Sequence, residues 1–155
     1  MEADQDQWRI RRAHLEDVKE MEICAKAAYR HYVTRIGKPP GPMLDDYAKL
    51  VEQHQAFVAE ESGRVVGVLV LILKNDGILM DNVAVLPEYQ GQGLGHQLIQ
   101  FAEAHAFERG YKNLDIYTHE LMTENIEMYR RLGYFETERR TEKGYRRVYM
   151  SKRLR

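Results

Sequence analysis

Three glycines occupy alternate positions in the stretch "PEYQGQGLGHQLIQFAEAHA", at Gly91, Gly93 and Gly95. They lie between a strand-like segment that ends at Pro87 and a helix expected over Gln92–Glu108. The first N–H groups of a helix have no internal partner, and the helix dipole adds positive charge at that end. Because glycine lacks a Cβ, an anion can approach these donors closely. The pattern is therefore typical of a phosphate-binding loop.

Two common phosphate-binding motifs do not fit this stretch. A P-loop requires G-x-x-x-x-G-K-[ST], and no Lys-Ser or Lys-Thr pair follows these glycines. The dinucleotide pattern G-x-G-x-x-G needs a glycine where the chain has His96, and it needs an early βαβ unit. The pattern Q/R-x-x-G-x-G/A does fit, and it is satisfied by Gln90, Gly93 and Gly95.

The elements that must position this loop follow from hydrophobic periodicity and turn residues. The expected order is β-α-α-β-β-β-α-β-α-β-β, with a Pro-rich loop, "IGKPPGPM", before the second helix. This order predicts an α+β fold in which helices cover both faces of a mostly antiparallel, mixed sheet of about six to seven strands. The expected segments are strand Trp8–Arg12, helix Leu15–Val33, helix Leu44–Gln55, strands within Ala56–Leu73 and Gly77–Pro87, helix Gln92–Glu108, strand Lys112–His119, helix Thr123–Gly133 and a closing hairpin.

Composition places limits on the class of protein. The 155 residues suit a single domain, 1–155, and contain 44% apolar and 30% charged residues, as in ordinary globular proteins. The lone cysteine, Cys24, lies within an expected helix and is interpreted as a packing residue. No apolar run is long enough to cross a bilayer. A cytoplasmic location without membrane partners is therefore expected.

Charge and histidine spacing exclude further classes. The net charge of −1 does not favour nucleic acid as a partner. From Arg139 to Arg155 there are eight Lys or Arg residues against one acidic residue, Glu142. We interpret this segment as the solvated face of a hairpin, with an electropositive rim for a polyanionic ligand as the alternative. The six histidines lack metal-ligand spacing, so no metal is expected.

The motifs together resemble the GNAT superfamily of acyl-CoA-dependent N-acyltransferases. The opening "IRRAHLEDVKEM", the segment "VVGVLVLI", the central "VAVLPEYQGQGLG" and the ending "YRRLGY" follow the family's order, and the resemblance covers about Trp8–Leu154. It implies acetyl-CoA as the cofactor. Its diphosphate would contact the backbone of Gln90, Gly91, Gln92, Gly93, Leu94 and Gly95, and its pantetheine arm would pair with Val83, Ala84 and Val85. Gln90 is expected to hold the loop.

The resemblance also assigns candidate catalytic residues. Tyr129 corresponds to the tyrosine that protonates the departing thiolate, with aromatic packing under its helix as the alternative. The family's usual asparagine position holds Met122, and Asn125 is the candidate that reaches pantetheine. Three residues are candidates for the base that deprotonates the amine, namely Asp81, Tyr117 and His119, and a water chain is a further alternative. Tyr29, Tyr32 and Tyr47 line an acceptor pocket or pack in the core.

The resemblance implies an N-acetyltransferase that moves an acetyl group from acetyl-CoA to a primary amine by direct attack in a ternary complex. A small metabolite and a protein or peptide amine both remain open as acceptors, and a homodimer is compatible with the family. Two alternatives stay open: a non-catalytic acyl-CoA-binding module of the same fold, and a nucleotide- or phosphate-binding domain of another fold.

Overall fold

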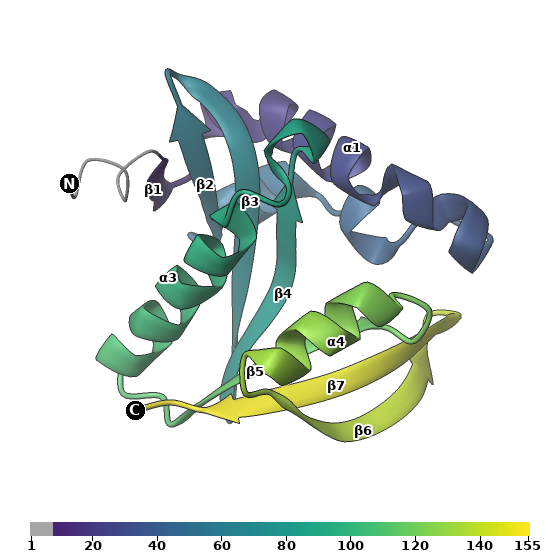
Figure 1. Cartoon of the computed structure of the whole chain (residues 1–155). Helices are drawn as coiled ribbons and strands as arrows, with labels where there is room; N and C mark the ends of the chain where they lie inside the picture. Colours follow the sequence, from purple (N-terminus) through teal and green to yellow (C-terminus); the bar gives the residue numbers. More distant parts are fainter. Residues whose placement is uncertain (1–7) are drawn as a thin grey trace.

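The protein, described here for residues 8–155 by a computed structural model, is built on a mixed sheet of seven strands in the order β1-β2-β3-β4-β5-β7-β6 (Figure 1). Residues 1–7 of the expected single domain lie outside the described residues. The strands are β1 (Arg9–Arg12), β2 (Ala56–Glu61), β3 (Arg64–Lys74), β4 (Gly77–Val85), β5 (Asn113–His119), β6 (Phe135–Glu142) and β7 (Tyr145–Arg153). The helices are α1 (Val18–Ile36), α2 (Tyr47–Glu52), α3 (Leu94–Glu108) and α4 (Thr123–Arg131). The α+β class and the helix and strand order are confirmed.

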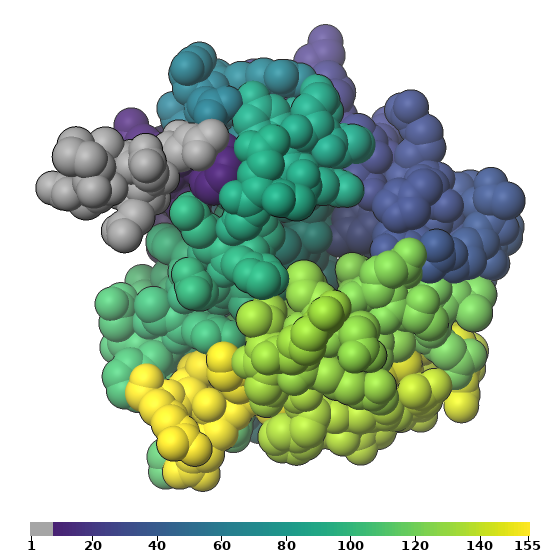
Figure 2. Space-filling model, viewed as in Figure 1, coloured from purple at the N-terminus to yellow at the C-terminus, as the bar shows by residue number. Residues whose placement is uncertain are grey.

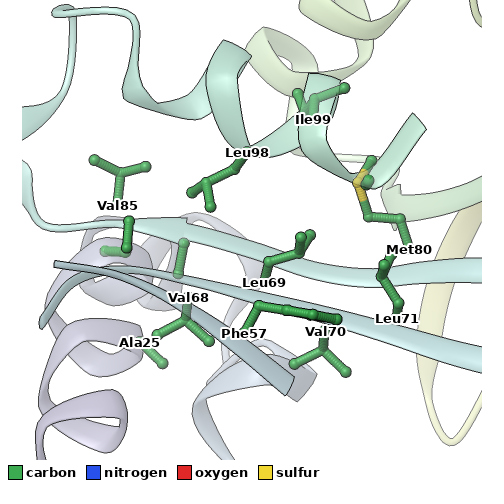
Figure 3. Packing of buried hydrophobic residues seen from close by; sticks show 14 of the residues in the cluster. Ala25, Phe57, Val68, Leu69, Val70, Leu71, Met80, Val85, Leu98 and Ile99 are labelled. Carbon is green, nitrogen blue, oxygen red and sulfur yellow. The ribbon is translucent and has the colours of Figure 1, made fainter. Parts of the chain in front are cut away.

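Helices cover both faces of the sheet, as the periodicity predicts. The apolar stripe of α3 includes Leu98 and Ile99, which are buried on one face of β3 and β4, whereas Ala25 of α1 packs on the other face (Figure 3). The strand β3 is buried on both sides, with seven consecutive buried residues, because it lies between these two helix layers. The core thus forms around the strands that flank the site described below.

The sheet splits between β4 and β5. These two strands are parallel and pair only at Leu79 with Asp115 and at Met80 with Ile116. Beyond Met80 the remaining residues of β4 have no partner on this side, and Figure 1 shows the two halves of the sheet separating there. The separation leaves backbone N–H and C=O groups of β4 facing an open slot, where an extended ligand could add as a strand.

A β-bulge lies at the point where the strands separate. In the pairing of β3 with β4, Val70 stands opposite Asn82 and Leu71 opposite Met80, so Asp81 is the extra residue. A bulge turns side chains away from their regular alternation and is common beside functional sites. Asp81 and Asn82 are therefore oriented by this irregularity.

The second helix is shorter than predicted. It begins at Tyr47, because the Asp46 side chain accepts a hydrogen bond from the Lys49 N–H and caps the helix there. Leu44, which periodicity places on the buried side of a longer helix, is 67% exposed in the preceding loop. The prediction of a helix from Leu44 to Gln55 was therefore wrong at both ends.

The basic C-terminal segment is largely neutralised by neighbouring glutamates. Five of its eight basic residues form ion pairs with glutamates, and β6 is almost wholly exposed. These contacts favour the interpretation as a solvated face. No helix within residues 8–155 combines the length and apolarity needed to span a membrane.

Candidate active site

The glycine loop connects β4 to α3 and keeps its backbone open. Gly91 and Gly93 have φ angles of 80° and 94°, a region that favours glycine, and Gly93 is the N-cap of α3. A Cβ built on either residue, or on Gly95, would meet no atom within 4 Å. Open space therefore surrounds the backbone at the first helical turn, whose N–H groups have no partner within the helix.

The side chain of Gln90 fixes the start of this loop. Its Nε2 donates a hydrogen bond to the Val85 carbonyl oxygen at 3.0 Å. The contact joins the loop to the end of β4 and gives Gln90 the structural role that the sequence predicts. Gln92 donates to the Glu88 carbonyl at 3.0 Å, which closes the loop on its other side.

A cleft runs from this loop along the unpaired part of β4, and we call it the glycine-loop cleft. It has a volume of about 560 Å³ and lies between the loop, β4, α1 and α4, where Figure 2 shows a hollow beside the teal residues of the loop. A volume of this size suits a cofactor or a drug-sized ligand. Its lining includes Tyr29, Tyr32, Val83, Ala84, Val85, Gln90, Gly91, Gly93, Gly95, His96 and Asn125.

A smaller cavity opens from the inner end of the glycine-loop cleft, and we call it the tyrosine cavity. Its volume is about 40 Å³, and it shares Tyr29, Val83 and Asn125 with the cleft. All four candidate catalytic residues line it, although they come from β4, β5 and α4: Asp81, Tyr117, His119 and Tyr129. The fold therefore brings together residues that are up to 48 positions apart in the chain, from 81 to 129.

Tyr129 lies on α4 with 7% of its surface exposed, and its ring is 5.6 Å from that of Tyr134. Burial raises the pKa of the Tyr129 phenol above its usual value of 10, so the hydroxyl keeps its proton at neutral pH. The position thus combines the packing role with a protonated hydroxyl at the cavity.

Asp81 of β4 and Tyr117 of β5 both line the tyrosine cavity at the split in the sheet, and each affects the pKa of the other. Burial raises the pKa of the Asp81 carboxyl, and the Tyr117 hydroxyl opposes that rise. Burial and the Asp81 charge together raise the pKa of Tyr117, so the phenol remains a proton donor. The Arg147 guanidinium lies over the Tyr117 ring at 4.3 Å from its centroid. Asp81 is consequently the better proton acceptor of the pair.

His119 has one ring nitrogen already engaged. Its Nδ1 accepts a hydrogen bond from the Leu121 N–H at 3.0 Å, and burial lowers the pKa of the imidazole. The neutral ring therefore carries its proton on Nε2, the nitrogen that would otherwise be free to accept one. This geometry disfavours His119 as a base.

Asn125 and Met122 occupy neighbouring places at the cavity. The Asn125 Nδ2 lies 3.6 Å from the Met122 Sδ, and the Thr118 hydroxyl lies 3.5 Å from the same sulfur. Asn125 also lines the glycine-loop cleft, so its amide stands where the two spaces meet. The described residues hold no group of three or more His, Cys, Asp or Glu side chains placed to bind a metal ion.

A third space, which we call the outer groove, adjoins the tyrosine cavity and shares no lining residue with the glycine-loop cleft. The outer groove and the tyrosine cavity share Gly41, Asp81, Tyr117, Tyr145 and Arg147. Asp81 thus faces both a route from the outer groove and the cavity that opens to the glycine-loop cleft. The arrangement allows two ligands to approach one point from different directions.

Sequence reasoning missed several of these residues. Asn82, Tyr145 and Arg147 line the tyrosine cavity, but no local pattern distinguishes them from ordinary strand residues. Three tyrosines were candidates for an acceptor pocket or for the core. Tyr29 lines the tyrosine cavity and the glycine-loop cleft, Tyr32 lines the cleft, and Tyr47 is 1% exposed in the core. Two predicted cofactor residues, Gln92 and Leu94, do not line the cleft, and the Leu94 side chain is fully buried.

Cys24 is a packing residue, as predicted. It is fully buried on α1, and its Sγ lies 4.0 Å from the Ala84 carbonyl. Burial raises the pKa of the thiol to about 12, so no thiolate is available as a nucleophile at neutral pH.

Comparison with protein-family models matches residues 16–134 to the acetyltransferase (GNAT) family. The match covers most of the chain, and the chain belongs to this family of acetyltransferases. Comparison with curated protein sequences found no match.

Solved structures agree with the fold. The PaiA N-acetyltransferase from Thermoplasma acidophilum, in complex with coenzyme A, has a TM-score of 0.80 at 15% identity, over 95% of this chain and 99% of that one. The ribosomal-protein-S18-alanine N-acetyltransferase from Escherichia coli has a TM-score of 0.76 at 19% identity, over 95% and 94%. The IAA acetyltransferase from Bacillus cereus has a TM-score of 0.68 at 21% identity, over 95% and 99%.

Proposed function

We propose that this protein is an acetyl-CoA-dependent N-acetyltransferase that acetylates a primary amine by direct attack within a ternary complex. One observation carries the proposal: the glycine-loop cleft and the outer groove meet at a cavity lined by Asp81, Tyr117 and Tyr129. A transferase of this kind needs two substrates at one point, with a proton acceptor on one side and a proton donor on the other.

The residues present fit coenzyme A. The backbone at Gly91, Gly93 and Gly95 suits its diphosphate, since the place of each missing Cβ is open space at a helix N-terminus. The unpaired edge of β4 at residues 83–85 suits the amide groups of its pantetheine arm. When bound, acetyl-CoA would supply the acetyl group as a thioester, and by the resemblance to the family an amide near Val85 would polarise the thioester carbonyl.

Asp81 is the proposed general base. An amine with a pKa near 10.4 arrives protonated at neutral pH, so it must lose a proton before it attacks. Asp81 accepts this proton at its carboxylate, directly or through the Tyr117 hydroxyl that lines the same cavity. The raised pKa of Asp81 improves it as an acceptor, because a stronger base holds the proton better.

Tyr129 is the proposed general acid. As the new C–N bond forms and the C–S bond breaks, its hydroxyl gives a proton to the departing sulfur. The raised pKa of the phenol makes it a weaker acid, but burial also raises the pKa of a thiolate's conjugate acid in the same cavity. The two effects oppose each other, so the proton transfer is less uphill than the raised pKa of Tyr129 alone would make it. The nitrogen loses its second proton as the intermediate collapses to the amide, and this proton, directly or through solvent, restores the Tyr129 phenol. Asp81 then releases its own proton to solvent, so the net reaction yields the amide, CoA as the thiol and one proton.

The test measures acetyl-CoA binding and CoA release with one protein sample. We expect calorimetry to detect binding of acetyl-CoA, and a panel of small amines and amine-bearing peptides to include at least one that releases CoA faster than water does. ATP and NAD serve as ligand controls, and neither should raise the melting temperature as acetyl-CoA does. Binding without turnover across the panel would favour a non-catalytic acyl-CoA-binding module instead.

A further inference from the structure

A chain of buried hydrogen bonds connects β4 to the loop before α2. Asn82, which is 3% exposed, accepts a hydrogen bond at Oδ1 from the Tyr29 hydroxyl at 2.7 Å. Its Nδ2 donates to the Tyr47 hydroxyl at 2.8 Å, and the Tyr47 hydroxyl donates to the Pro42 carbonyl. The Tyr29 hydroxyl also lies 2.9 Å from the Val83 carbonyl.

Position 82 requires a side chain that both donates a hydrogen bond, to Tyr47, and accepts one, from Tyr29. An amide meets both demands, whereas a carboxylate could not donate to Tyr47 and an apolar side chain could do neither. Both tyrosine pKa values are raised, chiefly by burial, so both hydroxyls keep their protons. Every member of the chain is therefore satisfied, and such a network fixes the parts that it joins.

The two ends of this chain reach different ligand spaces. Val83 belongs to the part of β4 that lines the glycine-loop cleft, and it follows Asn82 directly. Pro42 lines the tyrosine cavity, and its neighbour Gly41 lines both that cavity and the outer groove. We call residues 41–47 the wall segment. Asn82 thus joins the strand on the cleft side to the wall on the opposite side.

A second anchor holds the chain just before the wall segment. The Lys38 ammonium donates to the Gly144 carbonyl at 2.7 Å and lies 4.2 Å from the centroid of the Tyr145 ring. The Tyr145 hydroxyl donates to the Pro39 carbonyl. Residues 38 and 39 are thus fixed to the region of the β6–β7 turn, before the start of the wall segment. The hydrogen bond from Asn82 to Tyr47 then sets the position of the wall segment at its C-terminal end.

We propose that Asn82 is a positioning residue that couples the wall segment to β4, so that occupation of the glycine-loop cleft orders the amine site. This inference rests on the proposed function. A ligand that pairs with residues 83–85 restrains the main chain next to Asn82, and the amide passes this restraint to Tyr47 and Pro42. Binding of the amine then requires less ordering of the wall, which gives positive coupling between the two ligands.

The test uses Tyr47→Phe, which removes the hydroxyl and keeps the ring. In the wild type, acetyl-CoA should slow amide hydrogen exchange in the wall segment by about fivefold or more, the low end of typical coupling. In Tyr47→Phe this protection should be lost, while the Kd for acetyl-CoA stays within about twofold. With the best amine of the panel, KM for the amine should rise about three- to tenfold, as one lost hydrogen bond implies, with a smaller change in kcat.

Two further variants separate coupling from simple destabilisation. Tyr134→Phe is the matched control, because it removes a hydroxyl bonded to Glu103 at 2.8 Å, and Tyr134 does not line the tyrosine cavity. It should lower the melting temperature without changing wall protection. Tyr29→Phe removes the other partner of Asn82, and its effect on KM should be non-additive with that of Tyr47→Phe.

The outcomes distinguish this inference from the proposed function. If acetyl-CoA binds but leaves exchange of the wall segment unchanged, or if Tyr47→Phe keeps the full protection, the coupling is overturned and the proposed function stands. Additive effects of the two tyrosine variants would also overturn it. If acetyl-CoA does not bind the wild type at all, both proposals fail.

Discussion

At the scale of single residues, the bulge at Asp81 determines how this site can handle protons. The extra residue orients one carboxylate toward Tyr117 and the next side chain, Asn82, into a buried network. Two adjacent residues of one strand therefore have different proposed tasks. Asp81 is the proposed proton acceptor, and Asn82 is the proposed link that holds the surrounding backbone in place.

Removal of the Tyr129 hydroxyl should slow the chemical step. We expect Tyr129→Phe to reduce the single-turnover rate of acetyl transfer by roughly 10²-fold, the lower end for a general acid. The Kd for acetyl-CoA should change less than about threefold, since the ring still packs beside Tyr134. Equal single-turnover rates for variant and wild type would remove Tyr129 from the mechanism.

Replacement of Asp81 should change the pH dependence of the reaction. In the wild type, kcat/KM should rise with pH as the carboxyl loses its proton, with a midpoint above the ordinary aspartate value because its pKa is raised. Asp81→Asn should lower kcat/KM at pH 7 by roughly 10²-fold. This deficit should shrink toward pH 10, where the amine loses its proton without help.

His119→Gln provides the comparison for the base assignment. The decrease in kcat/KM at pH 7 should be smaller for His119→Gln than for Asp81→Asn, because His119 Nδ1 already accepts a hydrogen bond from the Leu121 N–H. A larger loss in His119→Gln, together with an unchanged pH profile in Asp81→Asn, would transfer the role of base to the histidine.

At the scale of elements, the junction of β4 with α3 is the proposed binding site for the cofactor diphosphate. Gly93→Asp places a side chain and a negative charge where the diphosphate is expected, so the affinity for acetyl-CoA should fall at least about tenfold. That loss corresponds to about 1.4 kcal/mol. Isothermal titration calorimetry measures it directly.

Gly110→Asp is the matched control for this element. Gly110 has a φ of 88° against 94° at Gly93, and an added Cβ there also meets no atom within 4 Å. The two variants therefore carry similar backbone strain, but Gly110 lies beyond the opposite end of α3. Similar losses of affinity in both would attribute the effect to strain and contradict the proposed diphosphate contact.

At the scale of the whole molecule, Asp45 of the wall segment makes stability depend on pH. Burial and the nearby Asp81 charge raise the pKa of Asp45 from 3.8 to about 6, and its Oδ2 is a buried atom without a hydrogen-bond partner among the described residues. Between these two values the folded state binds more protons than the unfolded state, so stability falls as pH rises.

Asp45→Asn should remove this dependence. At pH 7 the substitution removes the cost of ionising the buried carboxyl in the folded state. After discounting for solvent screening, this should raise the free energy of unfolding by about 1 kcal/mol and the melting temperature by roughly 2–4 °C. Near pH 4 the difference should vanish, because the wild-type carboxyl is then protonated. Thermal unfolding at both pH values measures this effect. Destabilisation of Asp45→Asn at pH 7 would show instead that Lys143 or Arg147 stabilises the ionised carboxylate.

Features that depend on local sequence were predictable. The order of helices and strands follows from periodicity, and the glycine loop follows from residue type at a strand–helix junction. The second helix was predicted to begin too early, at Leu44, because hydrophobic periodicity contains no information about the Asp46 side chain that caps the helix before Tyr47. Local signals therefore identify elements more reliably than they identify their ends.

By itself, the sequence determined the fold class and the position of the open glycine loop, and it supplied the candidate residues for proton transfer, since each depends on short-range spacing. Only the tertiary structure decided which of those residues meet. The split between β4 and β5 opens the cavity, the bulge aims Asp81 into it, and a backbone contact engages His119. The Asn82 bridge was likewise invisible beforehand, because its partners at Tyr29 and Tyr47 lie 53 and 35 residues away and meet only when the chain is folded.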